Sequence, residues 1–200
     1  MNEFHYFSCP VYRAELPGWV DQVLAVTQKH YDKSREEFGP SVVVQTYNLT
    51  ADPELSFLSN YFRDTCLEIL FNQGYRTDLH DFYTSSMWGQ EFGCYGSNLL
   101  HVHGNTLMSG FYFLETPEGG PYPIFEDPRP AKLMCDLPMR DFENVYVATP
   151  GIHFNNVAPG SLLVANSWLP HRFQMSQSDK PAKFIHFTIS AKDKQQCNMC

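Results

Sequence analysis

Residues 99–115 read LLHVHGNTLMSGFYFLE, and this stretch decides how the fold is interpreted. Two histidines, His101 and His103, are separated by one residue, and an apolar and aromatic run follows them. Alternate residues of a β-strand point to the same face of a sheet. If the stretch is a strand, both imidazoles project into one space and Val102 points to the opposite face.

A third histidine, His171, lies in NSWLPHRF, directly after the apolar run GSLLVAN at 160–166. Distant segments of this kind can lie side by side in a closed antiparallel barrel. Three imidazoles from two strands can hold one metal ion and leave coordination positions open, as catalytic sites do. The spacing also fits the alternative that the histidines are polar groups at a barrel rim. Of the other histidines, His186 in KFIHFTIS could point into the same space.

The composition favours a β-rich globular protein. Aromatic residues make up 15% of the 200 residues, and 14 prolines with 12 glycines supply turns. Apolar residues have helical spacing at 17–38 and 53–72, whereas short β-like runs begin at residue 79 and include VYVATPG at 145–151. We therefore expect one mainly β domain of the α+β class. A helical support region (1–78) precedes a β core (79–192), and a tail (193–200) follows.

The charge balance argues against two classes of partner. The 14 basic and 22 acidic residues give a net charge of −8, without a Lys/Arg cluster, so neither nucleic acid nor a membrane surface is expected to bind. No apolar run is long enough to span a bilayer, and no signal-peptide pattern is found at the N-terminus. We expect a cytoplasmic protein with reduced cysteines. Cys197 and Cys200 form a CxxC in the expected tail, which predicts a silent segment, with metal binding or redox pairing as the alternative.

Three blocks of sequence together resemble one family. They are HVHGNTLMSGFYFL at 101–114, FEDPR at 125–129 and PGSLLVANSWLPH at 159–171. In this order and combination they are similar to the small 2-oxoglutarate/Fe(II)-dependent oxygenases of bacteria and their phages, which are related to prolyl hydroxylases. The resemblance extends over about residues 85–190. It implies a double-stranded β-helix, a cupin-like jelly roll, whose mouth holds iron.

The resemblance also implies the iron ligands. His101 matches the first iron-binding histidine and His171 matches the distal one, whereas His103 stands where many relatives have Asp or Glu. The common triad in such enzymes is two histidines and one carboxylate. We expect His101, His103 and His171 to bind Fe(II), with Glu126 or Asp127 as the alternative source of a carboxylate.

For the cosubstrate, the family places a basic residue about ten positions after the distal histidine, where it pairs with the far carboxylate of 2-oxoglutarate. Lys183, twelve positions after His171, is the expected partner, and Tyr112 is expected to donate a hydrogen bond. Lys180 and Arg172 are alternatives, because the alignment is ambiguous by one or two residues. The segment KFIHFTIS also departs from the family, which has Arg followed by alternating Ser.

The implied activity is hydroxylation of a small molecule or a peptide, with release of succinate and CO₂. Phe111, Phe113, Trp168 and Phe173 are expected to line a dry substrate pocket, with core packing as the alternative. His103 in place of a carboxylate leaves open a three-histidine, cupin-type iron dioxygenase that does not use 2-oxoglutarate. A non-enzymatic jelly-roll binding module is the third alternative. Edge strands of such a fold can also pair two copies into a homodimer.

Overall fold

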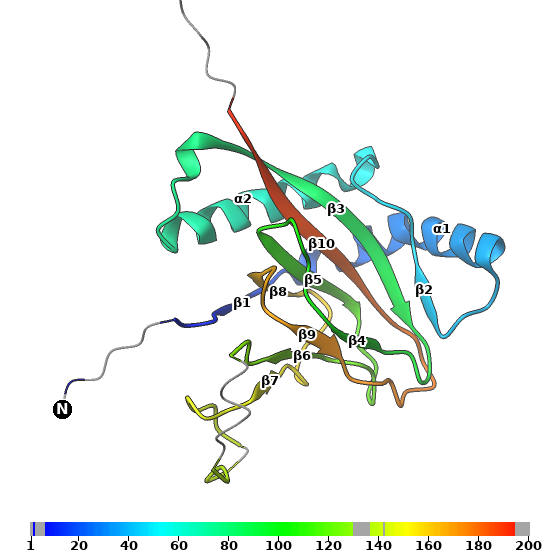
Figure 1. Cartoon of the computed structure of the whole chain (residues 1–200). Coiled ribbons are helices and arrows are strands. Elements are labelled where there is room, and N and C mark those ends of the chain that lie inside the picture. The colour runs from blue at the N-terminus through cyan, green and yellow to red at the C-terminus, as the bar shows by residue number, and fades with distance from the viewer. Residues whose placement is uncertain (1, 3–6, 130–136, 142, 195–200) are drawn as a thin grey trace, which may run out of the picture.

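Two antiparallel sheets face each other, and two helices cover the outer face of the larger sheet (Figure 1). The computed structural model describes residues 2, 7–129, 137–141 and 143–194. The large sheet consists, in spatial order, of β1 (Val11–Glu15), β8 (Ser161–Asn166), β5 (Met108–Glu115), β10 (Ala182–Asp193), β3 (His80–Phe92) and β2 (Val43–Gln45). The small sheet consists of β4 (Asn98–His101), β9 (His171–Phe173), β6 (Pro123–Glu126) and β7 (Gly151–His153).

From β3 to β10 the described strands alternate between the two sheets, except that β6 and β7 follow each other in the small sheet. This interleaving is that of a double-stranded β-helix, so the expected α+β fold with a jelly-roll core is confirmed. The expected support region also contributes β1 and β2, which extend the large sheet at its two edges.

The helices begin and end where local sequence signals place them. They are α1 (Val20–Phe38), preceded by the 3₁₀ turn η1 (Pro17–Trp19), and α2 (Ser56–Asn72), preceded by η2 (Pro53–Leu55). The Asp52 carboxylate accepts a hydrogen bond from the Glu54 N–H at 3.0 Å and caps the start of the second helical segment. Gly74, with φ of +94°, lets the chain turn away after α2.

Alternation along β10 separates two hydrophobic cores. Ile185 and Phe187 face the helices, and Phe187 stacks on Phe62 of α2 with ring centroids 3.9 Å apart. Phe184 faces the small sheet instead and stacks on Phe173 at 4.6 Å. The inter-sheet core is mostly aromatic and contains Phe92, Phe111, Phe113, Phe125, Phe173 and Phe184. Both faces of the large sheet are therefore covered.

Two short segments differ from the sequence prediction. Of the expected strand at 145–151, only its last residue belongs to β7, and Val145 and Val147 are exposed in the irregular segment before it. The three-residue strand β9 was not predicted as a strand, since it is too short to have a pattern. The CxxC of Cys197 and Cys200 lies outside the described residues.

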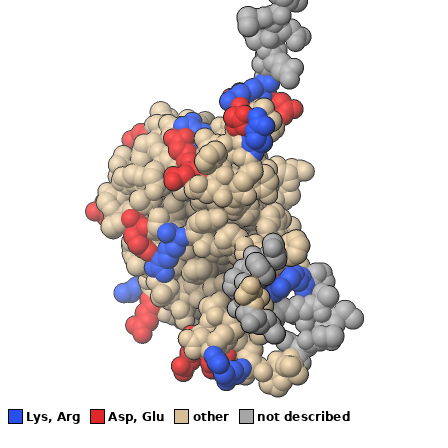
Figure 2. Space-filling view, turned by 90° about the vertical axis from the view of Figure 1, so that its left-hand side faces the viewer, with Lys and Arg blue, Asp and Glu red and all other residues tan. Residues whose placement is uncertain are grey.

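The surface in Figure 2 shows Lys and Arg in small groups beside Asp and Glu, with no continuous basic area on this face. This distribution agrees with the net charge of −8. In the described part of the chain, no helix has the length and hydropathy needed to cross a membrane.

Gly110 of β5 packs where a side chain does not fit. A Cβ added there would lie 2.5 Å from Phe187 Cζ and 2.6 Å from the Leu163 carbonyl oxygen. We expect Gly110→Ala to lower the free energy of unfolding by about 1–3 kcal/mol, measured by urea denaturation. Gly18→Ala is the control, since nothing lies within 4 Å of its added Cβ, and should change stability by less than about 0.5 kcal/mol. Equal stability of the two variants would contradict the close packing of β5.

Candidate metal centre

Strand register brings the first and third predicted histidines together. In the antiparallel β4–β9 pair, His101 lies directly opposite His171. Residues in opposite positions have Cβ atoms about 4.5–5.5 Å apart, and these two imidazole rings have centroids 4.5 Å apart. A pair of very short strands thus joins two segments that are far apart in the sequence.

His103 reaches the same place from just beyond β4, immediately before the turn at 104–105. β4 ends at His101, so the prediction that both histidines lie within one strand is only half correct. The His103 N–H donates to the Ser167 carbonyl at 3.0 Å, and the Thr106 hydroxyl donates to the His103 carbonyl at 3.2 Å. These bonds fix the turn against the segment before β9. The His103 ring centroid lies 5.0 Å from that of His101 and 5.1 Å from that of His171.

The spacing of the ring nitrogens fits one bound ion. Nε2 of His103 and Nε2 of His171 are 3.3 Å apart, and one ligand nitrogen from each of the three histidines lies within 4.8 Å of the others. Imidazole nitrogens bind a first-row metal ion at about 2.1 Å, so two neighbouring ligands of one ion are about 3.0–3.4 Å apart. The three histidines can therefore hold a metal with little rearrangement.

Main-chain hydrogen bonds set the tautomers of two of these rings. His101 Nδ1 lies 2.7 Å from the Leu99 carbonyl oxygen, and His171 Nδ1 lies 3.0 Å from the Leu169 carbonyl oxygen. A carbonyl oxygen only accepts hydrogen bonds, so each Nδ1 carries the proton. Each Nε2 is left with a lone pair, which is the arrangement that a metal-binding histidine requires.

The charge state of the rings also suits a metal. Burial, with repulsion from His101, lowers the pKa of His103 to about 4. Burial likewise lowers the pKa of His171 to about 4, against the opposing effect of the hydrogen bond to Leu169. Both rings are neutral at pH 7, and only a neutral imidazole can bind a metal.

Two further residues, His186 and Trp88, lie against this cluster. Their rings stack with centroids 4.1 Å apart, and the His186 ring centroid lies 4.6 Å from that of His103. Both ring nitrogens of His186 and Nε1 of Trp88 are buried without a hydrogen-bond partner. Burial holds the pKa of His186 well below its ordinary value. The strand pattern had pointed to His186 but gave no signal for Trp88.

A family comparison identifies the chain. Residues 86–187 match the sequence model of a family described as "Putative 2OG-Fe(II) oxygenase". The chain belongs to this family of 2OG-Fe(II) oxygenases. Fe(II) is accordingly the metal of the family and 2-oxoglutarate is its cosubstrate. No curated protein sequence matches the chain.

Solved structures show the same fold as this oxygenase. A prolyl-4-hydroxylase from Pseudomonas putida aligns over 92% of this chain and 94% of its own, with a TM-score of 0.60 and 12% identity. SnoK, an alpha-ketoglutarate-dependent carbocyclase from nogalamycin biosynthesis, aligns over 96% of this chain and 85% of its own, with a TM-score of 0.62 and 10% identity. HygX from Streptomyces hygroscopicus was solved with nickel, 2-oxoglutarate and hygromycin B bound. It aligns over 91% of this chain and 83% of its own, with a TM-score of 0.58 and 13% identity. At these identities the likeness is one of fold alone.

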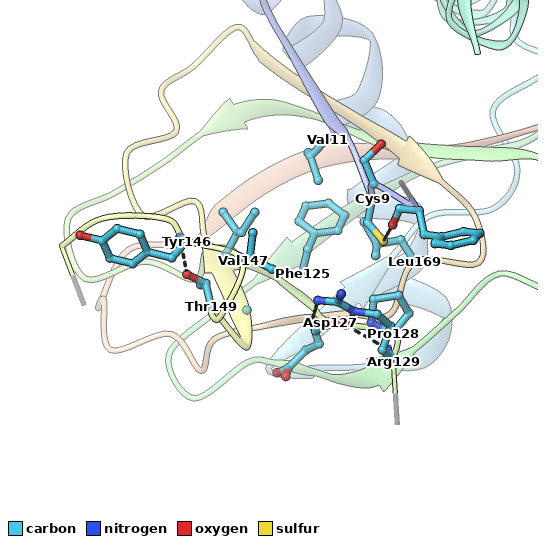
Figure 3. A pocket seen from close by; sticks show the side chains of 15 residues that line it. Cys9, Val11, Phe125, Asp127, Pro128, Arg129, Tyr146, Val147, Thr149 and Leu169 are labelled. Atoms are coloured by element: carbon cyan, nitrogen blue, oxygen red, sulfur yellow. Dashed lines mark hydrogen bonds and ion pairs between the residues drawn. The ribbon is translucent and has the colours of Figure 1, made fainter. Parts of the chain in front are cut away.

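The carboxylates considered as alternative ligands lie elsewhere in the oxygenase. Glu126 accepts a hydrogen bond from Arg172 at 2.8 Å, and Asp127 pairs with Arg129 at 2.6 Å. Both line a cavity of about 380 Å³, shown in Figure 3, where Phe125 forms part of the wall. Within the described ranges, the group of residues close enough to hold a metal contains three histidines and no carboxylate.

Lys183 does not face the metal cluster, so the structure does not place it where its predicted contact with 2-oxoglutarate would require. Because Phe184 points between the sheets, the preceding lysine points to the helix side of β10. Its Nζ lies 2.9 Å from Glu115 and donates to Gln28 of α1 at 3.3 Å. The alternative Lys180 is exposed in the β9–β10 connection, and Arg172 is engaged by its glutamate partner.

Two other predicted site residues, Tyr112 and Trp168, also lie away from the histidine cluster. Tyr112 faces the helices, where its hydroxyl donates to the Leu16 carbonyl at 2.8 Å and burial raises its pKa to about 12. It cannot donate to a ligand between the sheets. Trp168 is 48% exposed and lines a separate cavity of about 540 Å³ near the start of β3.

The three predicted phenylalanines do lie between the sheets. Phe111 has its ring centroid 5.3 Å from that of His171, so it forms one side of the histidine cluster. Phe113 and Phe173 belong to the same aromatic core, where core packing is their role.

The lowered pKa values predict how stability depends on pH. His103 and His171 take up protons on unfolding between pH 6.5 and about 4, so the metal-free protein should lose stability as pH falls through this range. We expect His171→Asn to flatten that dependence, measured by urea denaturation at several pH values. His153→Asn, at an exposed position, is the control and should leave the slope unchanged. A wild-type slope retained by His171→Asn would contradict the assignment.

Proposed function

We propose that this oxygenase is an Fe(II)- and 2-oxoglutarate-dependent hydroxylase whose iron is bound by His101, His103 and His171. The observation that carries the proposal is the convergence of these three rings, with ligand nitrogens within 4.8 Å of one another, in a 2OG-Fe(II) oxygenase chain. Two of the rings are oriented by their own main-chain hydrogen bonds. The donor set therefore fits a divalent iron ion.

When bound, iron and 2-oxoglutarate would use O₂ to hydroxylate a C–H bond, one oxygen atom passing to the substrate and the other to succinate as the cosubstrate loses CO₂. The chain's own residues orient the ligands and keep the site dry. Phe111 and Phe125 pack on His171, with ring centroids 5.3 Å and 5.6 Å away. An apolar wall of this kind excludes water and strengthens electrostatic interactions at the metal.

The substrate we propose is a small molecule or a peptide with an apolar part. Leu99, Leu100 and Val102 flank the metal-binding histidines in sequence and are 86%, 54% and 50% exposed. Exposed apolar side chains around a reactive centre provide a surface on which an apolar group can pack. The net charge of −8 disfavours a polyanionic substrate.

Two observations favour a second candidate function. Among the described residues the histidine cluster contains no carboxylate, and Lys183, the cation predicted to bind 2-oxoglutarate, lies on the other face of β10. Both features fit a three-histidine iron dioxygenase that acts without 2-oxoglutarate. The two functions differ in whether 2-oxoglutarate perturbs the bound iron.

Iron binding tests both functions. Anaerobic protein should bind one Fe(II) per chain in equilibrium dialysis, and His171→Ala should lower the affinity about 100-fold or more, because it removes a ligand rather than an outer partner. His153→Ala is the matched control and should bind iron as the wild type does. Full iron binding by His171→Ala would contradict the assigned site.

Addition of 2-oxoglutarate then separates the two functions. In the hydroxylase, the iron-loaded protein gains a weak visible charge-transfer band, and oxygen converts 2-oxoglutarate to succinate. In the alternative dioxygenase, iron binds but neither the band nor succinate is observed.

A further inference from the structure

We propose that the acidic cosubstrate is bound by two uncharged donors, Nε1 of Trp88 and the ring of His186, instead of by a lysine or an arginine. This inference rests on the proposed function, since it assigns further binding residues to the same site. It concerns the polar side chains between β3, β4 and β10.

Unpartnered buried atoms point to this pair. Four buried side-chain nitrogen or oxygen atoms of the described residues lack a hydrogen-bond partner, and three of them belong to Trp88 and His186. Native proteins leave few such atoms, because a buried donor without a partner is unfavourable. The three atoms are next to the metal-binding histidines, so their clustering indicates a ligand site.

The two rings are held in place before any ligand binds. Trp88 and His186 are register partners in the antiparallel β3–β10 pair, and their stacked planes differ by 21°. The His186 ring also packs against His103 and Phe111, with centroids 4.6 Å away in each case. Rings fixed on several sides hold their N–H groups in set directions, which lowers the entropic cost of binding.

A cavity connects this pair to the metal cluster. It has a volume of about 440 Å³ and is lined by Trp88 and His186 together with Gln90, Asn98 and His101, among others. This volume lies within the range of about 300–1,000 Å³ that is typical of small-molecule sites. The side chains of Gln90 and Asn98 add amide groups to the wall. A ligand in the cavity would therefore lie against the rings of Trp88 and His186 and next to an ion held by His101.

The described residues that line the cavity include no Lys, Arg, Asp or Glu, so a bound metal ion would be the source of positive charge there. Lys183 is held on the opposite face by Glu115. A carboxylate accepts strong hydrogen bonds from N–H donors that are shielded from water, and the ring nitrogens of Trp88 and His186 are buried. The arrangement also avoids the desolvation cost of burying a cation beside the metal.

The test measures cosubstrate binding without turnover. Wild type, Trp88→Phe and His186→Phe are loaded with Fe(II) under argon and titrated with 2-oxoglutarate, and the visible charge-transfer band is recorded. Each variant keeps an aromatic ring and removes the donor. We expect the half-saturating concentration to rise about 10- to 100-fold in each, with the iron content unchanged.

Two controls make the result specific. Lys183→Gln removes the cation expected from the family and should leave half-saturation within about twofold of wild type. Trp19→Phe is the matched tryptophan change, at a residue that packs on Phe57 and Tyr61. A donor variant is included only if its thermal unfolding transition shows that it folds. If one of the two variants does not fold, the half-saturating concentration of the other decides the test.

The outcomes distinguish this inference from the proposed function. Weaker binding in Lys183→Gln, with unchanged binding in Trp88→Phe and His186→Phe, overturns the inference and leaves the hydroxylase intact. Wild-type protein that binds iron but gives no band at any 2-oxoglutarate concentration overturns the hydroxylase and, with it, the inference.

Discussion

Side chains along β10 alternate between the core under the helices and the core between the two sheets, and this alternation determines which residues can reach the candidate metal centre. β10 is hydrogen-bonded to β3 on one edge and to β5 on the other, so its register is held by two ladders at once. Ile185 therefore packs under the helices, and Phe184 and His186 pack between the sheets. A shift by one residue would bury Lys183 in the aromatic core, which explains why this register is strongly specified.

The same alternation explains which site residues the sequence could predict. His101 and His103 were grouped because a spacing of two residues places side chains on one face of a strand, although in the structure His103 lies beyond the end of β4. Phe111 and Phe113, expected to line a substrate pocket or to pack in the core, lie between the sheets, and their position requires Tyr112 to face the helices. Lys183 was placed by counting positions from the distal histidine in related sequences, and such a count does not preserve the face of a strand.

The fold itself was predictable where patterns are long and local. The segment from Asp52 to Gly74 contains a cap, a periodic apolar face and a glycine that ends the helix, and it forms as predicted. The strand β9 contains three residues and has no pattern, although its register with β4 assembles the candidate metal centre. Trp88 was missed because its role depends on pairing with His186, across nearly half the chain.

The all-nitrogen donor set of the candidate metal centre has a consequence for metal selection. Affinity of such ligands for divalent first-row ions rises from manganese and iron through nickel to copper. Hydrogen bonds to Leu99 and Leu169 orient two of the rings without any metal, so the site is ready for whichever ion arrives. Selection of Fe(II) at such a site would depend on metal availability more than on affinity. We therefore expect the ion found in the isolated protein to reflect the medium from which it was purified.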